Sequence, residues 1–169
     1  MYIMKAIILA AGYATRLYPL TMNQPKALLP LAGKPILDYI VEKIEQVPAI
    51  DEILLITNTK FYPNFCTWAE NKKGGLPVSV FDDGTDSDET KLGAIGDLQF
   101  LIDKVGIDDD ILLMASDNYF EFSLKDFYDF YLEKGAESIC AKRIDSIADL
   151  RRMVDEGCSY AALFKKMKA

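Results

Sequence analysis

Residues 5–21, KAIILAAGYATRLYPLT, decide the fold, because a short apolar run meets a loop of small residues there. Residues 5–10 are apolar except for Lys5, and Gly12 ends the run, which predicts a strand buried on both faces of a sheet. The prolines at positions 19, 25 and 30 predict a long loop after this strand. The apolar run over residues 3–11 is too short to span a bilayer.

Strand and helix patterns alternate along the rest of the chain. Further strands are predicted over residues 51–57, 76–81, 110–116 and 137–142, and helices over 35–47, 60–73, 90–104, 123–132 and 146–156. The helix over 90–104 is expected to bury Leu92, Ile95, Leu98 and Leu101. Such alternation favours an α/β fold with three α/β/α layers, a mostly parallel sheet and a Rossmann-like architecture. We divide the chain into a nucleotide-binding α/β domain, residues 1–144, and a C-terminal helix and tail, residues 145–169.

Composition excludes several classes of function. The net charge of −7 and the lack of a basic stripe argue against a nucleic-acid partner. The chain has no histidine, which excludes histidine-based zinc sites and Ser-His or Cys-His triads. Its three cysteines are widely spaced, which fits a reducing cytoplasm better than a disulfide framework. We therefore expect a cytoplasmic protein without a membrane partner.

The loop after the first strand has the composition of a phosphate-binding site. Small residues at 10, 11, 12 and 14 let backbone N–H groups approach an anion closely. Arg16 offers a guanidinium fork and Lys26 a second cation, so together they predict a cradle for phosphates. Neither the P-loop pattern nor GxGxxG is present, because Pro35 follows Gly33-Lys34 and Ala14 replaces a glycine. The alternative is a plain turn with a surface arginine and lysine.

Asp117 follows the apolar strand predicted over residues 110–116. Ligands of α/β sheets bind at the carboxyl ends of the strands, and a carboxylate there suits Mg²⁺. We therefore predict Asp117 as a metal ligand, although a strand-end aspartate can also cap a turn. The acidic loop over residues 82–89 lacks the spacing of a calcium loop and is interpreted as solvated.

The segment AAGYATRLYPLT followed by QPKALLPLAGKPILDYI resembles the signature of the sugar-phosphate nucleotidyltransferases. This family includes glucose-1-phosphate thymidylyltransferases and their choline-phosphate cytidylyltransferase relatives, and it has the nucleotide-diphospho-sugar transferase fold. Ser116-Asp117-Asn118 is similar to the family's Gly-Asp-Asn element. The resemblance covers roughly residues 3–142, and Ala14 stands where many members have glycine.

The resemblance implies roles for individual residues. Ala11, Gly12, Tyr13 and Arg16 would bind the nucleotide, and Gly93 would let the nucleobase approach the backbone. Arg16 and Lys26 would be catalytic, because they would stabilise charge on the phosphates while pyrophosphate leaves.

The implied reaction joins two phosphates. A phosphorylated acceptor, such as a sugar phosphate or choline phosphate, attacks the α-phosphorus of a nucleoside triphosphate with Mg²⁺ as cofactor. The family's Glu-Lys-Pro-like segment and second metal-binding aspartate are not recognisable after Cys140. The alternatives are a nucleotide-binding or regulatory module without turnover, and a structural domain without a ligand. A missing acceptor half would expose apolar surface, so we also expect a two-fold homodimer.

Overall fold

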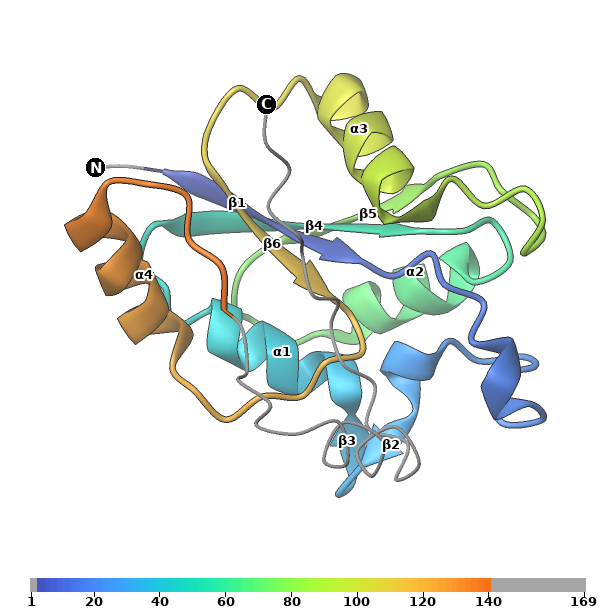
Figure 1. The fold of residues 1–169 in the computed structure, drawn as a ribbon. Coiled ribbons are helices and arrows are strands. Elements are labelled where there is room, and N and C mark those ends of the chain that lie inside the picture. The colour runs from blue at the N-terminus through green and yellow to red at the C-terminus, as the bar shows by residue number, and fades with distance from the viewer. Residues whose placement is uncertain (1–2, 141–169) are drawn as a thin grey trace, which may run out of the picture.

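The computed structural model describes residues 3–140, which form a parallel sheet covered by helices (Figure 1). The strands are β1 (Met4–Leu9), β4 (Ile50–Thr57), β5 (Val78–Asp82) and β6 (Ile111–Ala115). They lie in the order β5-β4-β1-β6, and every neighbouring pair is parallel. The four strands predicted over these parts of the chain are therefore confirmed, with β1 and β4 at the centre of the sheet.

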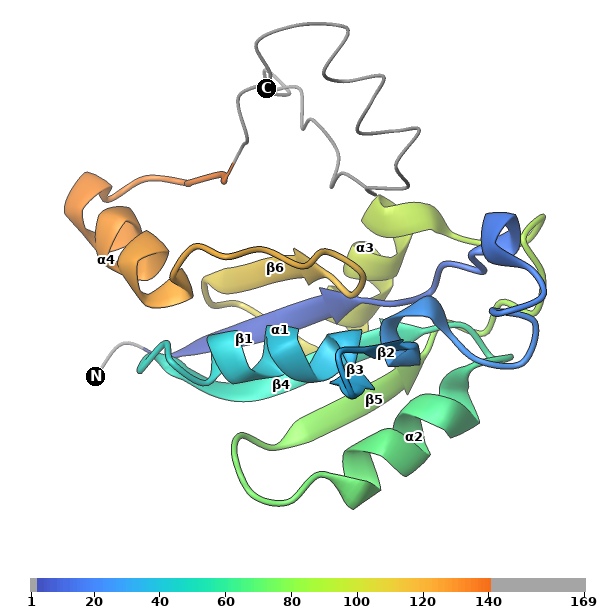
Figure 2. The same ribbon diagram turned by 90° about the horizontal axis from the view of Figure 1, so that it is seen from below.

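Helices cover both faces of the sheet, but unevenly. They are α1 (Ile36–Ile44), α2 (Tyr62–Asn71), α3 (Gly93–Val105) and α4 (Leu124–Lys134). Figures 1 and 2 show α1, α2 and α4 on one face and α3 on the other. The predicted three-layer α/β/α architecture is therefore confirmed for the described residues.

Two hydrophobic clusters explain why the central residues of both strands, 6–9 in β1 and 53–56 in β4, are all apolar. Alternate side chains of a strand point to opposite faces, so a strand covered on both sides needs apolar residues at every position. Ile8 and Leu55 pack with α1 and α2, whereas Ile7 and Leu54 pack in the cluster that contains Leu101 of α3. All five side chains are at most 1% exposed, which fixes the register of the two central strands.

The buried face of α3 differs from the one predicted from its sequence. Leu92 precedes the helix and is 44% exposed, and Ile95 is 68% exposed. The helix buries Leu101, as predicted, together with Asp97 one turn earlier. The prediction was wrong for Leu92 and Ile95, because apolar spacing was its only guide and a buried aspartate occupies the face that points to the sheet.

The C-terminal predictions have a different outcome. Residues 137–140 contain no strand, and Ile139 is 65% exposed, so the predicted strand over 137–142 is wrong for its described part. A strand needs a neighbouring ladder to pair its backbone, and residues 137–140 have none in the described sheet. The remainder of that strand, the helix over 146–156 and the boundary at residue 144 lie outside the described residues. In the described part, no helix has the length and apolarity to cross a membrane.

Short elements not predicted from the sequence shape the long loop after β1. They are two 3-10 turns, η1 (Thr15–Leu17) and η2 (Lys26–Leu28), and a hairpin of β2 (Pro30–Leu31) and β3 (Lys34–Pro35). Ala32 and Gly33 join the hairpin with φ values of 48° and 95°, as a tight two-residue turn requires. The Tyr39 hydroxyl of α1 donates to the Leu31 carbonyl at 2.9 Å, which holds the hairpin beside the helix.

Candidate active site

The loop after β1 leaves the sheet in a defined conformation. Ala10 N–H donates to the Ile56 carbonyl, so the β1–β4 ladder continues one residue beyond the strand. Ala14 then adopts the left-handed region with φ 47° and ψ 41°, and its carbonyl accepts from the Thr21 hydroxyl at 2.7 Å. Glycine is the residue best suited to this conformation, which explains why a small side chain is needed at position 14.

Three buried polar side chains fix the path of this loop. The Thr57 hydroxyl donates to the Ala10 carbonyl at 3.2 Å, and Asn58 Nδ2 donates to the Ala11 carbonyl at 2.8 Å. The Tyr13 hydroxyl donates to the carbonyl of Thr85 at 3.1 Å. These three hydrogen bonds join the loop to Thr57, Asn58 and Thr85, and they therefore restrict its conformation.

Thr57 and Asn58 were missed in the sequence analysis. Both are fully buried, and Asn58 Oδ1 also accepts from Phe61 N–H at the start of α2. A signal was available, since Thr57 ends a buried strand and Asn58 follows it, at the edge where ligands bind.

Lys26 is held in place by a rigid turn. It begins η2, whose next two residues, Ala27 and Leu28, are buried. The Gln24 side chain donates to the Leu28 carbonyl at 2.7 Å, which braces the turn from the other side. The lysine stem is thus anchored while its ammonium group lies at the edge of the sheet.

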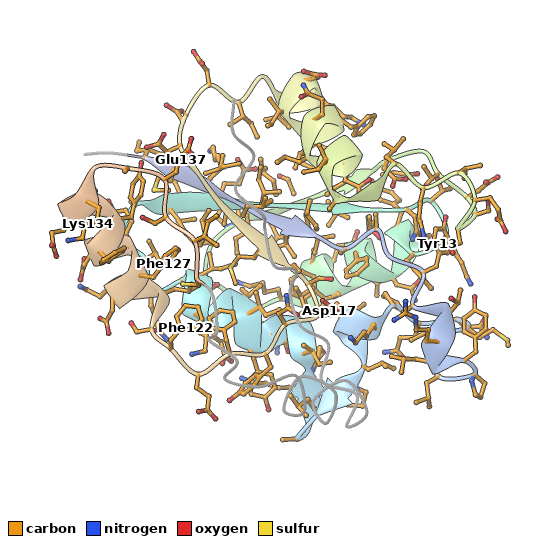
Figure 3. The ribbon with its side chains drawn as sticks, in the orientation of Figure 1. Tyr13, Asp117, Phe122, Phe127, Lys134 and Glu137 are labelled. Atoms are coloured by element: carbon orange, nitrogen blue, oxygen red, sulfur yellow. The ribbon has the colours of Figure 1, made fainter. Side chains whose placement is uncertain are left out.

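Asp117 reaches the same edge from β6. Ser116 N–H donates to the Leu9 carbonyl at 3.0 Å, so the β1–β6 ladder extends to the residue before Asp117. Lys26 Nζ lies 2.9 Å from Asp117 Oδ2 in an ion pair whose two side chains are 23% and 34% exposed. Figure 3 shows Asp117 and Tyr13 beyond the arrowheads of β1 and β6, at the carboxyl edge of the sheet.

A cavity of about 190 Å³ opens between these segments. Its lining residues come from β1 and its loop, η2, α2 and the end of β6: Leu9, Ala10, Gly12, Ala14, Pro25, Lys26, Ala27, Phe65, Ser116 and Asp117. A Cβ atom added at Gly12 would meet no atom within 4 Å, so the backbone here is open to a ligand. The cavity thus combines small residues, one ammonium group and one carboxylate.

Comparison with known proteins agrees with this arrangement. The sequence pattern described as "Nucleotidyl transferase" matches residues 5–147. The chain belongs to the nucleotidyl transferase family. The resemblance noted in the sequence is therefore confirmed at the level of the family.

Relatives and solved structures extend the comparison. The nucleotidyl transferase chain is 34% identical over 148 residues to mannose-1-phosphate guanylyltransferase 1 of Arabidopsis thaliana, covering 84% of this chain and 39% of that protein. It is 36% identical over 124 residues to the bifunctional protein GlmU of Methanocaldococcus jannaschii, covering 73% and 27%. UDP-glucose pyrophosphorylase from Acinetobacter baumannii shares the fold, with a TM-score of 0.61, 18% identity and coverage of 79% and 54%. The chain spans less than half of the length of the curated relatives it matches.

The predicted site residues of this nucleotidyl transferase fall into two groups. Gly12, Lys26 and Asp117 meet around the cavity. Ala11, Tyr13, Arg16 and Gly93 do not line it. Ala11 and Tyr13 are buried and hold the loop, whereas Arg16 is exposed in η1. Gly93 begins α3 with φ 76°, a conformation that suits glycine.

The donor set at the cavity suits magnesium. Mg²⁺ in nucleotide enzymes is commonly held by one or two carboxylates, with water and substrate phosphates completing its shell. Asp117 offers one such carboxylate oxygen, and no cluster of three acidic or cysteine ligands exists among residues 3–140. The site therefore fits a metal ion that arrives with the phosphates of its nucleotide, rather than one caged by protein alone.

Proposed function

We propose that this chain is a sugar-phosphate nucleotidyltransferase. In the reaction, a sugar phosphate oxygen attacks the α-phosphorus of a nucleoside triphosphate, the bond to the bridging oxygen breaks, and pyrophosphate leaves. The observation that carries the proposal is the meeting of Gly12, Lys26 and Asp117 around one cavity at the carboxyl edge of a parallel sheet. The names of relatives that act on mannose 1-phosphate and the pattern match over residues 5–147 support it.

Positioning and charge neutralisation account for most of the catalysis expected here. A phosphate nucleophile is ionised near neutral pH, so no general base is required and the absence of histidine is no obstacle. Lys26 would leave Asp117 for the phosphates when a triphosphate enters, because a polyanion is a stronger partner than one carboxylate. Asp117 would then be available to Mg²⁺, which when bound neutralises charge on the phosphate oxygens.

Arg16 fits the proposal in a different way from Lys26. Arg16 is exposed, and it lies on the short turn that follows Ala14. An exposed arginine on such a turn can fold over a bound triphosphate and bind two phosphate oxygens at once. We therefore keep Arg16 as a catalytic candidate that contacts the pyrophosphate part of the substrate.

A nucleotide-binding or regulatory module is the second candidate. It is favoured by the single carboxylate at the described cavity. Such a module would bind a triphosphate at the same residues without releasing pyrophosphate. The two candidates therefore make the same prediction for binding and different ones for turnover.

The deciding experiment measures pyrophosphate release and triphosphate binding side by side. Each of the four nucleoside triphosphates is combined with Mg²⁺ and mannose 1-phosphate, glucose 1-phosphate, N-acetylglucosamine 1-phosphate or choline phosphate. Release with one pair supports the transferase. Binding without release supports the module, and absence of both contradicts the proposed site.

Matched variants locate the activity. Lys26→Met and Asp117→Asn are expected to lower pyrophosphate release at least about 100-fold, the range for removing one preorganised charge from a transition state. Lys73→Met, at a lysine just after α2 and away from the cavity, makes the same change in net charge as Lys26→Met and should leave release unchanged. Equal losses in Lys73→Met and Lys26→Met would attribute the effect to overall charge.

Assembly and location are further parts of the proposal. β6 forms one edge of the described sheet, and Leu113 on it is 36% exposed, which supports a two-fold dimer. Light scattering that gives a monomer at micromolar concentration would argue against it. Cys66 and Cys140 are free thiols, which supports a cytoplasmic location.

A further inference from the structure

Two buried carboxyl groups lie beside the proposed nucleotide site. Asp83 directly follows β5, and Asp97 is the fifth residue of α3. They are 7% and 5% exposed, and their carboxyl groups are within hydrogen-bond distance of each other. Within residues 3–140, Asp83 Oδ2 and Asp97 Oδ1 have no hydrogen-bond partner. One proton shared between the two groups would supply the missing bond, whereas two adjacent buried charges would repel.

The surroundings assign this proton to Asp97. Asp83 Oδ1 accepts from Thr85 N–H and from the Thr85 hydroxyl, both at 2.7 Å, and these donors stabilise a charged carboxylate. Burial, and then the charge of Asp83, raise the pKa of Asp97 from 3.8 to about 6. Asp97 is therefore the hydrogen-bond donor and Asp83 the acceptor when the pair is protonated.

The pair is connected to the loop after β1. Thr85, which donates to Asp83, accepts from the Tyr13 hydroxyl through its carbonyl at 3.1 Å. Tyr13 is 5% exposed and stands between Gly12 and Ala14, which both line the cavity. A continuous series of contacts thus leads from α3 through Asp83 and Thr85 to the residues proposed to hold phosphates.

The same pair fixes the start of α3. Gly93 opens the helix one turn before Asp97, and no side chain caps that end. A proton shared between Asp97 and Asp83 would therefore hold the first turns of α3 on the turn after β5. The position of Gly12 and the position of Gly93, the two glycines predicted to approach the nucleotide, would thus both depend on the Asp83–Asp97 pair.

We propose that Asp97 is a positioning residue for nucleotide binding, whose protonated carboxyl group holds α3 against the turn after β5 and so fixes the loop after β1. This inference rests on the proposed nucleotide-binding function. Deprotonation places two like charges in a buried site, which separates α3 from the turn and lowers affinity for the nucleotide. Affinity is therefore expected to fall as the pH rises through neutrality.

The charged groups around the pair do not offset this repulsion. Asp83 faces Asp97 from the end of β5, and Tyr13 faces the same turn from the loop after β1. Burial raises the pKa of the Tyr13 hydroxyl, and the negative charges of Asp83, Asp86 and Asp88 raise it further. In the described part of the chain, neither carboxyl group of the pair has a lysine or arginine in an ion pair.

The test compares nucleotide binding by the wild type and by Asp97→Asn across pH. Isothermal titration with ATP, CTP, GTP and UTP in Mg²⁺ is carried out from about pH 5 to pH 8. The amide of the Asp97→Asn variant can donate to Asp83 at every pH, so the ratio of the two dissociation constants cancels the titration of the triphosphate itself. With about a tenth of the wild type protonated at pH 7, its affinity should be about tenfold below that of Asp97→Asn, and equal to it near pH 5.

Further variants keep the result interpretable. Asp83→Asn retains an acceptor for Thr85 and offers an amide donor to Asp97, so it should flatten the pH dependence as well. Asp103→Asn removes an exposed carboxylate from the same helix and should follow the wild type. Parallel pH profiles for the wild type, Asp97→Asn and Asp83→Asn would overturn the inference and leave the proposed function intact. Absence of triphosphate binding by every protein at every pH would overturn both.

Discussion

Asp97→Asn is expected to stabilise the folded chain, and to do so only above the acidic range. Asp97 is 5% exposed on the face of α3 that points to the sheet, where an apolar residue would normally pack. Burial and the charge of Asp83 raise the pKa of its carboxyl group, so the folded state favours the neutral acid. Asparagine has nearly the same shape and is neutral at every pH.

The size of the effect follows from the two pKa values. The pKa of Asp97 rises from 3.8 to about 6 on folding, and each pH unit is worth about 1.4 kcal/mol. Below about pH 3 aspartate is protonated in both states, so wild type and variant should be equally stable. As the pH rises from about 4 to about 6 the unfolded state releases the proton first, and the wild type loses up to about 3 kcal/mol relative to the variant.

Urea unfolding followed by circular dichroism at several pH values measures this difference. The free energy of unfolding of Asp97→Asn minus that of the wild type should be near zero at about pH 3 and constant above about pH 7. Asp103→Asn, on the exposed side of α3, should show no such pH-dependent gain. A difference that does not change with pH, or a variant less stable than the wild type at pH 7, would refute the assignment of a shared proton to this pair.

Three further substitutions test the local structure by the same unfolding measurement. Asn58→Ala should lower the free energy of unfolding by about 3 kcal/mol, because the Ala11 carbonyl and the N–H at the start of α2 both lose a buried partner. The control variant Asn71→Ala, at an exposed asparagine, should change the free energy of unfolding little. Ala14→Gly should raise the free energy by up to about 1 kcal/mol, since φ is 47° there, and a loss of that size would contradict the left-handed conformation. Ser123→Ala should lower the free energy of unfolding by about 1 kcal/mol, because the N-cap hydrogen bond of α4 is lost. An unchanged free energy of unfolding would show that this cap contributes nothing to stability.

The secondary structure could be predicted where a local pattern repeats. The apolar runs of β1 and β4 indicated strands buried on both faces. In α1 the buried residues recur at helical spacing, at Leu37, Ile40, Val41 and Ile44. Ser123 and Gly135 cap the two ends of α4, and each is of a residue type that favours its position. These patterns involve residues that are close together in the sequence, so they can be recognised without the tertiary structure.

The predictions failed where the signal lies in a partner distant in sequence. The apolar spacing assigned Ile95 to the buried face of α3, but the structure buries Asp97, which faces the sheet and interacts with Asp83. Residues 137–140 have a strand-like composition but no strand in the structure. In both cases the structure of the segment depends on the surface that it packs against, and apolar spacing contains no information about that surface.

The sequence by itself determined the family, the order of strands and helices, and the two charged residues that line the cavity. Gly12, Lys26 and Asp117 could be placed at one edge because parallel strands share the direction in which they end. Only the tertiary structure decided that Lys26 meets Asp117 across 91 residues of chain, and that a buried acid pair fastens α3 to the loop after β1. The physical reason is that side-chain pairing depends on distances of a few ångströms, which are set by how whole elements pack and not by the residues adjacent in the chain.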